Sequence, residues 1–183
     1  SADVHLRAMI YLGLNCGFGN SDCGTLPIAA VDLDGGWVNY HRRKTGIQRR
    51  CPLWPQTVRA LKRSLAKRPK AKADDADGLF FVTKYGNPWG KDVADSPVTK
   101  EFCKLLDTLK LHRPGLGFYT LRHSFRTAAD GSGDQVAANA IMGHVDDSMA
   151  AVYRERIDDE RLKKVAHHVR RWLVSGRKGV KRG

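Results

Sequence analysis

The chain has 183 residues, with 32 Lys or Arg against 19 Asp or Glu, which gives a formal net charge of +13 at neutral pH. This length allows one domain with a buried core. The apolar runs fall well short of the roughly 20 residues that span a bilayer. A basic surface attracts polyanions and neutralises phosphates. The composition therefore argues against a membrane-spanning protein and favours nucleic acid, over an acidic membrane surface, as the partner.

The N-terminus and the cysteines bear on compartment and metal binding. Residues 1–5 lack a basic stretch followed by an apolar one, so no secretory signal is predicted, and Ser1 suggests that the sequence begins inside a longer protein. The four cysteines form no Cys-x-x-Cys pair, and their spacing is too wide for zinc. We therefore expect reduced thiols in a cytoplasmic protein, and no metal site.

In chain order, the first predicted element is a buried helix over residues 3–14, where apolar residues recur at helical spacing. Glycines interrupt this pattern, with a short turn or helix at 21–23. Three short β-type runs at 30–33, 37–40 and 50–53 then predict a small antiparallel sheet. The second hairpin of this sheet is rich in cations: Arg42, Arg43, Lys44, Arg49 and Arg50.

The second half of the chain is predicted to be mostly helical. A helix over 55–68 leads through a basic linker at 67–72 and an acidic turn at 74–78 to a further short strand at 79–82. Later helices are expected at 96–110, 119–130, 134–142, 147–154 and 158–174. The fold class is thus α+β, mainly helical with one small three-stranded antiparallel sheet. One domain is expected over 1–175, with a disordered basic tail over 176–183.

The strongest local signal is Tyr119-Thr-Leu-Arg122, followed by Gly-His144 and, nine residues beyond this histidine, by Tyr153. Upstream, Lys44-Thr-Gly falls on the cationic hairpin. In this order and at these spacings, the segments resemble the catalytic domain of the tyrosine recombinase, or phage integrase, family over essentially the whole chain. That family has a His-x-x-Arg element, a later Gly-His, a tyrosine nucleophile, and a lysine on a hairpin. The resemblance implies the tyrosine-recombinase catalytic-domain fold.

The resemblance also implies a site-specific DNA recombinase that cuts and rejoins strands through a 3′-phosphotyrosyl intermediate, without metal, ATP or another cofactor. Tyr153 would be the nucleophile, and the covalent bond would conserve energy for religation. A phenol with a pKa near ~10 is a poor nucleophile, so cations must stabilise the charge on the scissile phosphate. Arg122 suits the phosphate oxygens, His144 would hydrogen-bond the phosphate, and Lys44 would protonate the leaving 5′-oxygen.

Two positions depart from the family pattern. Tyr119 replaces the histidine of His-x-x-Arg, and Gly19 stands where the family's first arginine is expected. Loss of such an arginine costs on the order of 10³–10⁵ in rate in phosphoryl transfer. Arg126 shares a helix face with Arg122, so we expect Arg126, or less favourably Arg43, to supply the second guanidinium.

The same resemblance suggests the partners. Double-stranded DNA would be held by five residues: Arg42, Arg43, Arg49, Arg50 and His123. Four protomers are expected in a synapse on DNA, with the segment 158–174 packing on a neighbour, while the isolated domain is free to be monomeric. By the same resemblance, we expect the family's N-terminal core-binding domain to be absent from this sequence.

Two other functions remain open. Gly19 favours a catalytically impaired DNA-binding protein on the recombinase scaffold, such as a regulator or a mobile-element remnant. A basic helical RNA-binding domain would leave the spacing between His144 and Tyr153 as coincidence. Each motif residue alone has an ordinary structural explanation, for instance Arg122 as an ion-pair partner, and only the ordered set favours the recombinase.

Overall fold

The structure is a computed structural model that describes residues 3–42, 46–72, 74–90, 96–144 and 157–176. The helix predicted at 147–154 and nearly all of the predicted tail lie outside these residues. The described part is mainly helical and contains one three-stranded antiparallel sheet. The predicted fold class is therefore confirmed.

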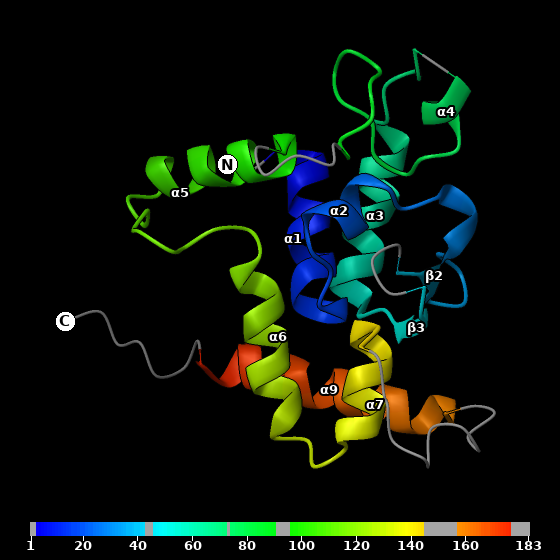
Figure 1. Cartoon of the computed structure of the whole chain (residues 1–183), viewed down its shortest axis with the longest axis vertical. Coiled ribbons are helices and arrows are strands. Elements are labelled where there is room, and N and C mark those ends of the chain that lie inside the picture. The colour runs from blue at the N-terminus through cyan, green and yellow to red at the C-terminus, as the bar shows by residue number, and fades with distance from the viewer. Residues whose placement is uncertain (1–2, 43–45, 73, 91–95, 145–156, 177–183) are drawn as a thin grey trace.

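Most predicted elements form within a few residues of their expected ends (Figure 1). The helices are α1 (Val4–Cys16), α2 (Asn20–Gly24), α3 (Pro55–Ala66), α4 (Asp74–Asp77), α5 (Pro97–Thr108), α6 (Thr120–Asp130), α7 (Gln135–Met142) and α9 (Asp159–Ser175). The strands are β1 (Val31–Asp32), β2 (Trp37–His41) and β3 (Gln48–Pro52), and a 3₁₀ turn, η1 (Ile28–Ala30), precedes the sheet.

Helix α1 is the central element and packs against both α3 and α6. The Asp3 carboxylate caps its start by accepting from the amides of His5 and Leu6. Gly17 ends it in the left-handed conformation, with φ at 63°, which favours glycine. The direction of the chain just after Gly17 brings residues 18–24 beside the sheet, so α1 fixes where the segment containing Gly19 lies.

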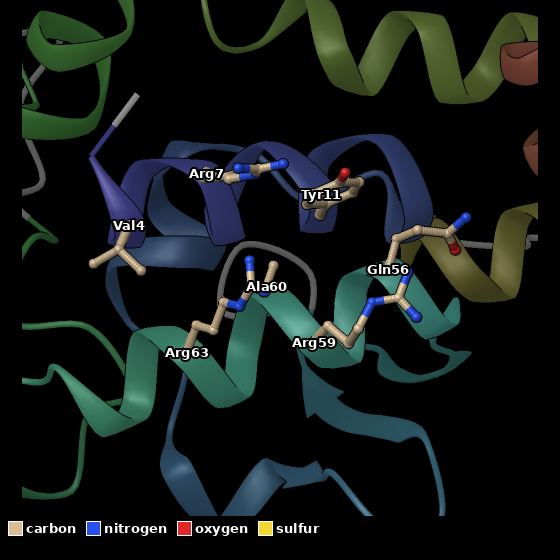
Figure 2. Close-up of a pocket in the computed structure, with 7 residues that line it drawn as sticks. All are labelled: Val4, Arg7, Tyr11, Gln56, Arg59, Ala60 and Arg63. Carbon is tan, nitrogen blue, oxygen red and sulfur yellow. The ribbon is translucent and has the colours of Figure 1, made fainter. Parts of the chain in front are cut away.

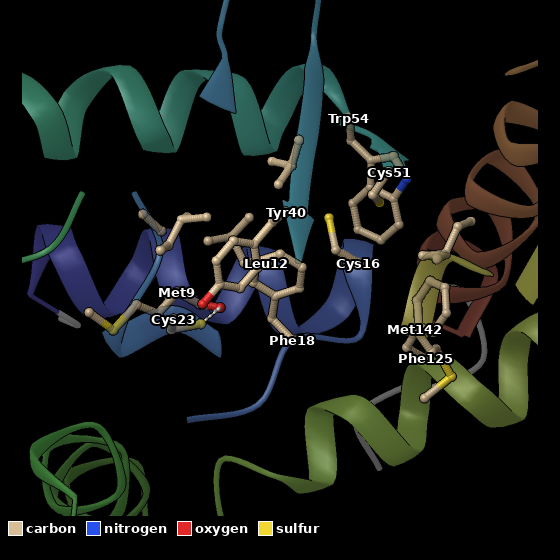
Figure 3. Close-up of a cluster of buried hydrophobic side chains, with 14 of the residues drawn as sticks. Met9, Leu12, Cys16, Phe18, Cys23, Tyr40, Cys51, Trp54, Phe125 and Met142 are labelled. Carbon is tan, nitrogen blue, oxygen red and sulfur yellow. Dashed lines mark hydrogen bonds between the residues drawn. The ribbon is translucent and has the colours of Figure 1, made fainter. Parts of the chain in front are cut away.

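The sheet has the order β1-β2-β3, and its register pairs Val38 with Cys51 and Tyr40 with Arg49. These four side chains are buried, whereas Asn39 is exposed, as strand alternation requires. Leu12, Cys16, Phe18 and Tyr40 form one apolar cluster between α1 and the sheet (Figure 3). Strand β3 therefore turns every second side chain into the core.

The C-terminal helices close the other side of the core, where α9 packs against α6, α7 and β3 (Figure 1). Leu162, Val165 and Val169 of α9 are buried, and Trp54 donates from Nε1 to the Ala166 carbonyl at 2.9 Å. The chain therefore buries much of the apolar face of α9 itself, whereas Trp172 and Val174 are 45% and 46% exposed. Packing of residues 158–174 on a neighbouring protomer stays a prediction.

Two predictions about the middle of the chain are wrong. Residues 79–82 form no strand of the sheet, because Leu79 and Val82 make only isolated bridges to Pro27 and Pro88. The amides of Phe80 and Ile28 supply the hydrogen bonds around the first bridge, and the pairing extends no further among the described residues. The acidic segment predicted as a turn contains the one-turn helix Asp74–Asp77. Among the described helices, none is long and apolar enough to cross a membrane.

Candidate active site

The guanidinium of Arg122 joins the ends of two helices. Arg122 lies in the first turn of α6, is 2% exposed, and donates to the carbonyl of Gly17 and, at 2.9 Å, to that of Met142. Gly17 follows α1, and Met142 is the last residue of α7. Burial lowers the pKa of Arg122, and the positive charge of Arg42 lowers it further. The predicted phosphate-binding arginine is therefore fixed at a meeting point of three helices.

His144 lies at the same place, directly after α7. Its amide donates to the Asn139 carbonyl at 3.0 Å, and its side chain is half-buried. Burial lowers the pKa of His144, and the charges of Arg122, Arg42 and Arg126 lower it further. The imidazole is therefore neutral near pH 7, with one nitrogen that donates and one that accepts.

Arg42 reaches this site from the end of β2. Its Nη1 donates to the Gly143 carbonyl at 3.3 Å. Gly143 has φ at 63°, and a Cβ there would lie 3.1 Å from Cδ of Arg42 and 2.7 Å from Cδ of Arg49. Glycine at 143 therefore lets both arginine side chains pass close to the end of α7.

Arg49 is not available to DNA in this structure, which corrects its predicted role. Its side chain has no exposed surface, and its Nη2 donates to Asp22 at 2.9 Å. The guanidinium carbon lies 4.2 Å from the centre of the Phe18 ring and 5.1 Å from that of Tyr40. Strand alternation places Arg49 on the inward face with Tyr40, and the carboxylate and the two rings compensate its buried charge.

Arg126 also differs from its predicted role. Its guanidinium pairs with Asp130 at 2.8 Å through Nε, while Nη1 donates to Asn139 and Nη2 donates to Gln135 at 2.7 Å. All three nitrogens are therefore engaged: Nε within α6, and Nη1 and Nη2 in joining α6 to α7. This arrangement argues against Arg126 as the second phosphate-binding guanidinium.

The remaining predicted residues are distributed unevenly. Arg50 forms a two-point ion pair with Asp159 at 2.8 Å and lies 3.9 Å from the centre of the Trp37 ring, so its charge is already partly balanced. His123 is exposed and packs edge-on against Tyr119. Three predicted residues lie outside the described part of the chain: Arg43, Lys44 and Tyr153.

The two departures from the family pattern contact each other. A Cβ at Gly19 would lie 3.4 Å from the ring of Tyr119, which is 48% exposed. The Gly19 amide donates to the Asp22 carboxylate at 2.8 Å. A longer side chain at position 19 would therefore have to run along the tyrosine ring.

The sequence identified Arg42 only as a DNA-binding residue of the cationic hairpin, and it did not reveal Asp22 as a member of this site. Arg42 follows β2 two residues after the buried Tyr40, so strand alternation could have placed it on the inward side. Asp22 sits three residues after Gly19, the position from which a carboxylate caps a helix start, and this spacing could have identified it.

A separate basic pocket of about 100 Å³ lies between α1 and α3. Figure 2 shows the side chains of Arg7, Arg59 and Arg63 around it, together with Tyr11. The pocket is distinct from the site around His144, because the arginines that lower the pKa of His144 are Arg122, Arg42 and Arg126 and none of these lines the pocket. The described residues contain no cluster of three or more His, Cys, Asp or Glu that could hold a metal ion.

The chain resembles solved structures of recombinases and integrases. XerH site-specific recombinase bound to its difH substrate has 19% identity and a TM-score of 0.61, over 89% of this chain and 46% of that one. XerA recombinase has 18% identity and a TM-score of 0.64, over 98% and 60%. The integrase from mycobacterium phage Brujita has 16% identity and a TM-score of 0.66, over 92% and 53%. This chain thus spans about half the length of these proteins and shares their fold.

Among curated proteins, none matches the chain in sequence. A family model described as the phage integrase family matches residues 1–160. This match covers α1 to α7 and includes the segments that bring Arg42, Arg122 and His144 together. The chain therefore belongs to the phage integrase family.

Proposed function

We propose that this chain is the catalytic part of a site-specific recombinase or integrase that cuts and rejoins double-stranded DNA. The observation that carries the proposal is the convergence of Arg122 and His144 on the end of α7, nine residues before Tyr153. A buried arginine beside a neutral imidazole can bind a phosphate oxygen and leave a proton acceptor for a phenol. Membership of the phage integrase family supports the same activity.

The proposed reaction exchanges one phosphodiester for another. The Tyr153 oxygen attacks phosphorus and forms a bond to the 3′-phosphate, and its proton passes to a base. The bond to the 5′-oxygen breaks, and Lys44 protonates that oxygen. Attack by the 5′-hydroxyl of another strand reverses these steps and releases Tyr153, so no ATP is consumed. Arg122 stabilises the negative charge on the phosphate throughout.

DNA is the proposed partner, and four copies of the chain would act together in the synapse. Two solved relatives in structure are described with DNA: XerH bound to difH substrate and the Tn1549 transposon integrase with circular intermediate DNA. The net charge of +13 supports binding to the phosphate backbone. Arg42 and His123 keep their proposed DNA-facing roles, as does Arg43. For Arg50, we propose a weaker contribution because Asp159 balances its charge.

A covalent-trapping experiment tests the reaction. The chain is incubated with 5′-labelled duplexes of randomised sequence that carry a nick, and proteins that retain label are detected on a denaturing gel. The parent should retain label, Tyr153→Phe should not, and Tyr85→Phe, which changes an exposed tyrosine, should match the parent. An adduct that persists in Tyr153→Phe would remove this residue as the nucleophile.

A second function, DNA binding without cleavage, is favoured by Gly19 and by its contact with Tyr119. It predicts that the parent binds the duplexes but forms no adduct. It also predicts that Gly19→Arg combined with Tyr119→His gains an adduct, because the pair restores the family's residues at two positions that touch. Adduct formation by the parent would exclude this second function.

A further inference from the structure

Two guanidinium groups and one imidazole meet at the end of α7, over residues 142–144. Arg122 donates to the Met142 carbonyl, Arg42 donates to the Gly143 carbonyl, and His144 comes next. Consecutive Cα atoms are about 3.8 Å apart, so the two guanidinium groups are bound to adjacent peptide units. They reach this point from α6 and from the end of β2, which are far apart in sequence.

Within the described residues, the charges at this point are only partly balanced, because Asp22 acts on Arg122 from a distance but already pairs with Arg49. Arg49 and Arg126, which lie beside the same site, each have a carboxylate partner, Asp22 and Asp130. In the part of the chain that the structure describes, Arg42 and Arg122 form no ion pair and bond only to carbonyl oxygens. The carbonyl end of α7 offers partial negative charge, but two full positive charges remain in a half-buried setting. An anion bound between them would balance these charges.

We propose that Arg42 binds the same phosphate as Arg122 and supplies the second guanidinium that Gly19 cannot. The inference rests on the proposed function, because the phosphate in question is the scissile one. Arg42 fits this role better than Arg126, since its guanidinium makes a single hydrogen bond, to a carbonyl, among the described residues and can turn other N–H donors to a ligand. The charge of Arg42 also lowers the pKa of His144, which agrees with a position of Arg42 close to the proposed phosphate site.

Phosphate binding can be measured without DNA cleavage. Inorganic phosphate is titrated into the parent, Arg42→Ala, Arg42→Lys and Arg59→Ala, and the ring signals of His144 are followed by NMR, with His144→Gln used to assign them. Arg59 is the matched control because it is an exposed arginine of the separate α1–α3 pocket. Sodium chloride is adjusted to hold ionic strength constant, because salt screens exposed charges.

We expect a saturable shift in the parent and about tenfold weaker binding in Arg42→Ala, since charge-assisted hydrogen bonds are the strong ones. Arg42→Lys should lie between the two, and Arg59→Ala should match the parent. Binding by Arg42→Ala within twofold of the parent would overturn the proposal, and so would the absence of any saturable shift in the parent. If Arg42→Ala does not fold, Arg42→Lys decides, because lysine keeps the charge but loses the planar fork.

The outcome is independent of the covalent-trapping experiment. A chain that forms no adduct can still bind phosphate through Arg42, in which case the cleavage proposal fails and this inference stands. If the chain forms an adduct and Arg42→Ala binds phosphate as the parent does, the cleavage proposal stands and the inference about Arg42 fails.

Discussion

Removing the charge of Asp22 is expected to destabilise the fold strongly. Asp22 accepts from Arg49 at 2.9 Å and from the Gly19 amide at 2.8 Å. Of the described residues, none is a hydrogen-bond partner for Nε or Nη1 of Arg49, so Asp22 is the carboxylate on which its buried charge depends. Asp22→Asn keeps an oxygen for Gly19 but removes this compensation.

The magnitude follows from burial. Removing one partner of a buried ion pair costs about 3–5 kcal/mol. The rings of Phe18 and Tyr40 still face the guanidinium and offset part of that cost. We therefore expect the free energy of unfolding to fall by about 3 kcal/mol, a large share of the roughly 5–15 kcal/mol typical of a domain.

Urea unfolding followed by circular dichroism at neutral pH measures this loss. The matched control is Asp34→Asn, because Asp34 pairs with Lys62 at 3.0 Å with side chains that are 96% and 53% exposed. Such surface pairs contribute less than about 1 kcal/mol. Asp22→Asn combined with Arg49→Met should recover stability relative to Asp22→Asn alone. Equal losses in Asp22→Asn and Asp34→Asn would refute the reasoning.

Three further predictions concern stability. Gly143→Ala should lower the melting temperature more than Gly46→Ala, because both glycines have positive φ but only the first would bring a Cβ to 2.7 Å from an arginine side chain; equal shifts would contradict the proposed crowding. Asn15→Ala should cost at least about 2 kcal/mol in urea unfolding, because its side chain accepts from two donors in the core and donates to a carbonyl. Burial lowers the pKa of His5 and of His144, so the unfolded chain binds protons that the folded chain does not. Stability should be fully present above about pH 6.5 and be lost as pH falls through the folded-state pKa values; unfolding at about pH 7.5 and about pH 5.5 should show a smaller loss for His5→Gln than for the parent, and an equal loss would argue against this cause.

Local sequence patterns determined most of the fold. The helical spacing of apolar residues located α1, α3, α6, α7 and α9, and alternating runs located the sheet. These patterns depend on neighbours within a few residues, so they survive without knowledge of the rest of the chain. The strand expected at 79–82 was wrong because pairing depends on a partner segment from elsewhere in the chain, and Leu79 and Val82 each find only an isolated bridge.

The sequence by itself also determined the family, because Arg122, His144 and the residues that flank them keep the family's order and spacing. Only the tertiary structure decided which arginines are buried, paired or free at the end of α7. Arg42 and Arg49 are equally basic in the sequence, yet Asp22 and two aromatic rings surround Arg49, while Arg42 reaches the Gly143 carbonyl. The physical reason is that a buried charge depends on partners brought from distant segments, which no local pattern records.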